Sequence, residues 1–103
     1  MNNNYSLLED PNNIFDCPSG ITQIANTPDG SALFLYCAVG FNGTLFSWDE
    51  INYFRIMKQI EITGPMVTDV NNNLYAPITN YGHRSKHLCP LAMFDASNQY
   101  SSK

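Results

Sequence analysis

Short apolar runs alternate along the chain with residues that favour turns. Residues 21–25 predict a short strand. Residues 32–39 form an unbroken apolar run, which is typical of a central strand buried on both faces. Between them, Thr-Pro-Asp-Gly at residues 27–30 supplies turn chemistry, because proline presets its φ angle and glycine accepts left-handed backbone. We therefore predict that the first two strands form a hairpin.

Two further hairpins are predicted from asparagine-rich segments. Asn42-Gly43 is the preferred pair for a two-residue type I′ turn, because both central residues need a positive φ angle. Residues 66–70 and 74–78 flank three consecutive asparagines, which tolerate left-handed backbone. The second of these strands is predicted to lie at a sheet edge, because Pro77 lacks an N–H donor.

The main helix is predicted at residues 48–61. The sequence from Ser47 to Glu50 resembles a capping box, with Asp49 favourable at the positive end of the helix dipole. Apolar residues at positions 51, 54, 57 and 60 keep the three-to-four spacing of a helix face. Gly-Pro at residues 64–65 would end the helix.

These elements predict an α+β fold: a small antiparallel sheet of four or five strands in the order β-β-β-α-β-β, with the 48–61 helix packed on one face. A length of 103 residues suits one domain spanning residues 1–103. We expect a partly irregular N-terminal arm at 1–19 and a frayed C-terminal tail at 96–103. The other face of the sheet would be covered by the arm and an apolar segment at 88–94, or by a second copy in a homodimer.

Charge divides the chain unevenly. No lysine or arginine precedes Arg55, so residues 1–54 carry a net charge of −6, and the remainder carries +2, which sums to the total of −4. Such asymmetry bears on partners and encounter rates. The candidate partner-binding residues are the six early acids: Glu9, Asp10, Asp16, Asp29, Asp49 and Glu50.

Reactive chemistry finds little support in the sequence. His83, His87 and Cys89 have spacing that metal ligands can use, but no close cysteine pair completes a zinc site. Cys17 lacks an activating environment, and Asp16 beside it would raise the pKa of its thiol. Phosphate-binding, dinucleotide-binding and common hydrolase motifs are absent from the sequence. We therefore predict no catalytic residue, no metal, no cofactor and no enzymatic activity.

The expected location is the cytoplasm. Cys17, Cys37 and Cys89 are odd in number and show no close pairing, which argues against a disulfide framework and suits a reducing compartment. The start lacks the pattern of a secretory signal, and no apolar run approaches the ~18 residues that span a bilayer. We accordingly interpret two glycosylation sequons, at Asn4 and Asn42, as chance matches.

The leading functional hypothesis is a non-enzymatic acidic module for protein–protein interaction. Such a module could act as an inhibitor, immunity or antidefence protein of a phage or mobile element by occluding a basic surface. One alternative is a small Cys/His-dependent enzyme or ligand-binding domain. A second is weak nucleic-acid binding through the basic loop at 82–87, although the two charges of Arg84 and Lys86 are few for that role.

Overall fold

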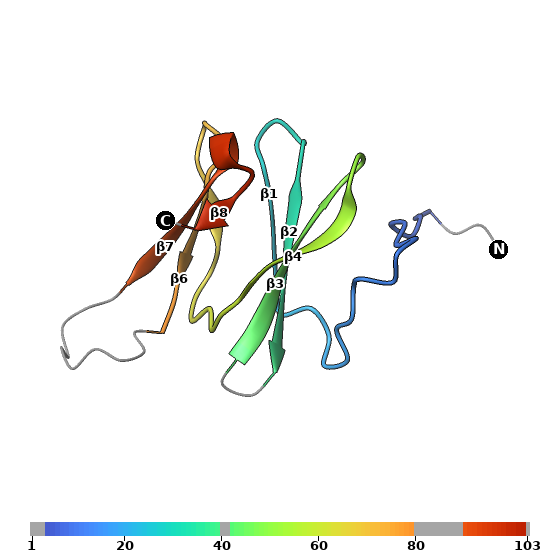
Figure 1. The fold of residues 1–103 in the computed structure, drawn as a ribbon, viewed down its shortest axis with the longest axis horizontal. Coiled ribbons are helices and arrows are strands. Elements are labelled where there is room, and N and C mark those ends of the chain that lie inside the picture. The colour runs from blue at the N-terminus through green and yellow to red at the C-terminus, as the bar shows by residue number, and fades with distance from the viewer. Residues whose placement is uncertain (1–3, 40–41, 80–89, 103) are drawn as a thin grey trace.

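The computed structural model describes residues 4–39, 42–79 and 90–102, and it shows two antiparallel sheets of four strands each, packed face to face (Figure 1). Each sheet is a meander in which neighbours in sequence pair in space. The first contains β1 (Gln23–Asn26), β2 (Leu33–Val39), β3 (Asn42–Asp49) and β4 (Tyr53–Gln59). The second contains β5 (Val67–Thr68), β6 (Leu74–Pro77), β7 (Leu91–Asp95) and β8 (Ser101–Ser102), with the 3-10 helix η1 (Ala96–Asn98) before β8.

The predicted α+β fold is wrong, because the 48–61 segment is the end of β3, a turn and β4. Over the described residues, η1 is the only helical segment. The side chain of Asp49 caps a turn: its Oδ1 accepts from the N–H of Ile51 at 2.9 Å and of Asn52 at 2.6 Å. Ser47, predicted as the helix cap, is buried in β3.

The apolar spacing of this segment fits a strand that buries side chains on both faces and contains a β-bulge. Leu45 pairs with Lys58 and Phe46 with Ile56, so Met57 is an extra residue between the two pairs. Phe54 packs on the outer face of the first sheet, whereas Met57 packs toward the second sheet. Apolar residues three apart thus lie on opposite faces of this strand, whereas in a helix they would lie on one face.

Local turn chemistry predicted one of the first two connections. Gly30 has a φ angle of 76° and its N–H donates to the carbonyl of Thr27 at 3.0 Å, so the 27–30 turn is confirmed. The turn prediction at Asn42-Gly43 is wrong, because both residues belong to β3, opposite Val39 and Ala38. A Cβ atom on Gly43 would collide with the Tyr36 ring, so glycine is required there for packing.

The third hairpin is confirmed as β5 and β6, but its predicted edge position is wrong. β6 lies between β5 and β7. Pro77 is tolerated because it is the last residue of β6, beyond the two residues of β5. The predicted 88–94 cover is also wrong: residues 91–95 are β7, inside the second sheet. Residues 96–102, predicted as a frayed tail, contain η1 and β8.

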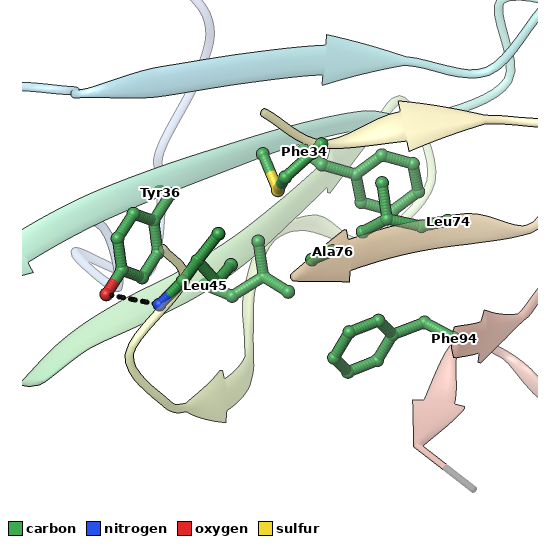
Figure 2. Close-up of a cluster of buried hydrophobic side chains, with 8 residues drawn as sticks. Phe34, Tyr36, Leu45, Leu74, Ala76 and Phe94 are labelled. Atoms are coloured by element: carbon green, nitrogen blue, oxygen red, sulfur yellow. Dashed lines mark hydrogen bonds between the residues drawn. The ribbon is translucent and has the colours of Figure 1, made fainter. Parts of the chain in front are cut away.

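The main core fills the space between the two sheets (Figure 2). Phe34, Leu45, Leu74 and Ala76 are fully buried there, and Phe94 is nearly so. β2 is the central strand predicted at 32–39, with β1 and β3 on its two sides.

Tyr36 joins the sheets at the crossover between β4 and β5. Its hydroxyl donates to the carbonyl of Ile60 at 2.8 Å and accepts from the N–H of Ile62 at 3.0 Å, as seen in part in Figure 2. The single side chain therefore satisfies two backbone groups of the segment that passes from one sheet to the other.

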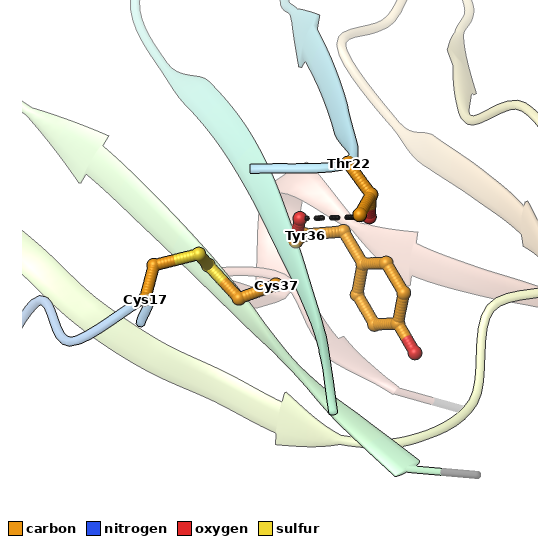
Figure 3. The surroundings of a disulfide bond; sticks show 4 residues. All are labelled: Cys17, Thr22, Tyr36 and Cys37. Carbon is orange, nitrogen blue, oxygen red and sulfur yellow. Dashed lines mark hydrogen bonds between the residues drawn. A yellow bond between two sulfur atoms is a disulfide. The ribbon is translucent and has the colours of Figure 1, made fainter. Parts of the chain in front are cut away.

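The N-terminal arm packs on the outer face of the first sheet. This part of the predicted cover is confirmed, although the 88–94 segment does not share it. The Phe15 ring lies 4.8 Å from that of Phe46 and 4.6 Å from that of Phe54. Cys17 forms a disulfide with Cys37 of β2 (Figure 3), with their Cα atoms 5.6 Å apart. The prediction against a disulfide is thus wrong. Among the described residues, none lies in a helix of the length and apolar character that crossing a membrane needs.

Candidate functional site

Four connections gather at one end of the sandwich, the upper end in Figure 1. We call this region, residues 27–32, 49–53, 69–73 and 95–100, the loop end. Side-chain hydrogen bonds join three of the four connections. Asn72 Nδ2 donates to Asp29 Oδ2 at 2.9 Å across the two sheets, and Asn73 Oδ1 accepts from the N–H of Ala96 at 2.9 Å within the second sheet. The connections of the two sheets are therefore linked at the loop end.

A groove of about 640 Å³ opens at the loop end between the two sheets. Its polar lining includes Asp49 and Glu50, and Arg55 is the one cation among the described residues that line it. Arg55 Nε and Asn72 Oδ1 are buried in the lining without a hydrogen-bond partner among the described residues. Unsatisfied polar atoms lower stability, and natural proteins tend to keep them where function requires them.

Three aspartates fix the backbone of the loops. The carboxylate of Asp29 accepts from the N–H of Ser31 at 2.8 Å, and Asp69 accepts from the N–H of Asn71 and of Asn73, each at 2.9 Å. Asp49 does the same in the β3–β4 turn. Such side-chain-to-backbone bonds build turns at defined geometry. The loops are thus pre-ordered by the same residues that give them charge.

These hydrogen bonds also keep the aspartates ionised. Contacts from Ser31, through its side chain and then its backbone, lower the pKa of Asp29 below 3.8. For Asp49 and Asp69, desolvation is the largest single influence and acts upward, but the combined hydrogen bonds outweigh it, so the pKa of each is lowered from 3.8. The loop end is consequently anionic at neutral pH.

The pKa values of two tyrosines near these aspartates are raised. Burial raises the pKa of Tyr100, and the charges of Asp29 and Asp49 raise it further. The hydrogen bond from Tyr75 to Asp69 raises the pKa of Tyr75, with burial and Coulombic repulsion from Asp69 adding to it. Deprotonation is opposed mainly by burial at Tyr100 and mainly by the hydrogen bond to Asp69 at Tyr75, and nearby negative charge adds to both effects.

Half of the six predicted acids meet at the loop end: Asp29, Asp49 and Glu50 lie in or beside its turns. Glu9, in the arm, lines the same hollow as Glu50. Asp10 and Asp16 do not join them. Asp10 caps the arm by accepting from the N–H groups of Ile14 and Phe15, each at 3.0 Å, and exposed Asp16 precedes the disulfide cysteine.

Two acids of the loop end, Asp69 and Asp95, were not among the predicted binding residues. Asp69 opens the β5–β6 turn, and Asp95 caps η1 by accepting from the N–H of Ser97 at 2.9 Å. A signal existed for Asp69, because it stands directly before the asparagines that predicted the turn. Asp95 lay between the predicted cover at 88–94 and the predicted tail at 96–103, where no turn was expected.

Glu50 lies where three hollows meet. It lines the groove, a smaller hollow beside β1 and β2, and a third hollow beside the arm. Glu50 is exposed, and no described residue forms a hydrogen bond or ion pair with its carboxylate. Its charge is therefore available to a partner.

No protein-family model, curated protein or solved structure matches this chain. The function must accordingly be inferred from the chemistry of the loop end itself.

Of the candidate reactive groups, only Cys17 lies within the described residues. Cys17 is bonded to Cys37, which removes the thiol that an attack on a substrate would need. The predicted metal-ligand candidates His83, His87 and Cys89, and the basic loop at 82–87, lie outside the described residues. Within the described ranges, histidine, cysteine and acidic side chains form no group of three or more that could hold a metal ion.

Proposed function

We propose that this chain is a non-enzymatic interaction module whose loop end binds a basic protein surface. The observation that supports it most is the position of Glu50, an exposed carboxylate with no described partner at the junction of three hollows. Asp49 lines one of these hollows, and Asp29 and Asp69 add further negative charge to the loop end. Complementary charge of this kind steers encounter and selects the partner.

Pre-ordered loops favour such binding. Because three aspartates already hold the turns, little backbone entropy is lost when a partner docks. Two apolar side chains project from the turn tips: Ile51 is 87% exposed and Val70 is 88% exposed. Exposed apolar groups beside charged ones are typical of protein interfaces.

An inhibitor, immunity or antidefence role for a phage or mobile element fits this design, because carboxylates on a fixed surface can occupy a target's basic site. We do not favour the enzyme alternative, because the Cys17 thiol is consumed in the disulfide. The acidic loop end would repel a nucleic-acid backbone, which weighs against the second alternative.

The proposal can be tested with a synthetic peptide rich in arginine and lysine. Binding is measured against the wild-type chain and two variants with equal charge change: Asp29→Asn with Glu50→Gln at the loop end, and Asp16→Asn with Glu61→Gln elsewhere. Asparagine at position 29 can keep the turn, since it forms the same side-chain-to-backbone bond. Thermal unfolding of each variant controls for folding.

We expect the loop-end variant to bind about tenfold more weakly and with a shallower salt dependence, because it removes charge from the contact surface. The control variant should stay within about twofold of wild type. Equal losses in both variants would mean that only net charge matters, and the loop end would then not be the binding surface.

A further inference from the structure

The hollow between the arm and the β3–β4 hairpin has a composition that suits one ligand chemistry. It measures about 390 Å³ and is lined by two leucines, two aromatic residues and two carboxylates: Leu7, Leu8, Glu9, Trp48, Glu50 and Tyr53. We propose that it is a pocket for the side chain of an arginine on the partner. This inference rests on the proposed function and adds the group that the partner would insert.

The aromatic walls come from the two strands that flank the β3–β4 turn. Trp48 is held in place by a hydrogen bond from its Nε1 to the backbone carbonyl of Glu9 at 3.2 Å, which also ties the arm to the hairpin. Tyr53 starts β4 with a φ angle of 58°, a left-handed conformation that aromatic residues rarely adopt. Retaining this conformation costs stability, and it sets Tyr53 in the lining of the pocket.

The charge of the lining selects a cation. Glu9 and Glu50 are both exposed, and no described residue pairs with either carboxylate. The described residues that line the pocket include no lysine, arginine or histidine. Arg55, the cation of the neighbouring groove, lines that groove and not this pocket. A cation entering the pocket would thus meet two carboxylates that no described residue neutralises.

Among biological cations, a guanidinium fits best. It is planar and stacks on aromatic faces, and its five N–H donors can serve two carboxylates at once. Leu7 and Leu8, which are 85% and 44% exposed, offer apolar surface to the methylene stem of the arginine. A lysine ammonium would satisfy the carboxylates but would gain less from the rings, because it is more strongly hydrated.

Trp48 is the only tryptophan of the chain, so its fluorescence reports on this pocket directly. The probe is Nα-acetyl-arginine amide, and the matched neutral probe is Nα-acetyl-citrulline amide, which has nearly the same shape without the charge. We expect a saturable change in Trp48 emission with the arginine probe, weakened by salt. The citrulline probe should bind at least about tenfold more weakly.

Variants separate the charge from the rings. Glu50→Gln keeps the shape but removes one carboxylate. Tyr53→Asn removes a ring while tolerating the left-handed backbone. Each should weaken the arginine probe at least about fivefold, and Asp16→Asn, outside the pocket, should leave binding within about twofold. If Tyr53→Asn lowers the thermal midpoint strongly, Glu50→Gln and amide chemical-shift changes in the wild-type chain decide the question.

The proposal is overturned if citrulline binds as well as arginine, if Glu50→Gln has no effect, or if the shifted amides lie away from residues 7–9 and 48–53. Failure of the pocket proposal can be distinguished from failure of the proposed function. If the basic peptide still binds in a loop-end-dependent manner while the arginine probe does not, the pocket is rejected and the interaction surface stands. If both ligands fail, both proposals are rejected.

Discussion

Breaking the disulfide between Cys17 and Cys37 should lower the free energy of unfolding by about 3 kcal/mol. The bond closes a loop with a sequence separation of 20 residues. For that loop, the chain-entropy model gives about 11 cal/mol/K of lost entropy in the unfolded state, which is about 3 kcal/mol at 25 °C. The same bond holds the arm where Phe15 packs on Phe46 and Phe54, so its loss also weakens that cluster.

The assay is urea unfolding of Cys17→Ala and of its parent, both carrying Cys89→Ser so that no other thiol can exchange. With a slope of about 1.5 kcal/mol/M, the midpoint should fall by about 2 M. A reducing agent should lower the midpoint of the parent by a similar amount and leave Cys17→Ala unchanged. In the oxidised wild-type chain, a thiol reagent added in denaturant should detect only Cys89.

Two results would refute this reasoning. Three reactive thiols in the unreduced, denatured chain would mean that Cys17 and Cys37 are not bonded. An unchanged midpoint on reduction, with the bond shown to be present, would mean that the arm contributes no cross-link stability to the sandwich.

Three further predictions concern stability. Tyr36→Phe should cost about 1–3 kcal/mol in urea unfolding, because the buried N–H of Ile62 loses its acceptor; a neutral result would show that water replaces the hydroxyl. Gly43→Ala should cost at least about 1–3 kcal/mol in the same assay, because the new methyl group would meet the Tyr36 ring and lie 2.7 Å from the backbone oxygen of Cys37; wild-type stability would contradict the tight packing. Because the folded-state pKa values of Asp49 and Asp69 lie below 3.8, their stabilisation is present above that pH and is lost as pH falls through the folded values; the thermal midpoint should drop there, and less so in Asp69→Asn.

Local chemistry predicted the parts of the fold that depend on local contacts. The 27–30 turn follows from a proline and a glycine within four residues, and the β5–β6 hairpin follows from its asparagines. The 48–61 segment failed for a physical reason. A carboxylate that accepts from the N–H groups two and three residues later serves a helix start and a hairpin turn equally well, as Asp49 shows. The choice depends on pairing between β3 and β4, which is not encoded within the turn.

Contacts distant in sequence were the least predictable. The disulfide depends on the path of the arm across β2, and an odd cysteine count says nothing of that path. The candidate site was predicted in part, because negative charge along the first half was visible. Its actual membership follows from the turns: Asp69 comes from the second half of the chain, and Asp10 from the first half is occupied in the arm.

The arrangement of each sheet as an uninterrupted meander bears on how quickly the molecule assembles. Within the part of the chain that the structure describes, each strand ladder joins partners adjacent along the chain, and residues 60–66 lead from the first sheet to the second. Sandwiches whose strands alternate between layers must close long loops before their pairings form, which slows them. Here the ladders within each sheet join strands that follow one another, so we expect the folding barrier to lie mainly in docking the two sheets.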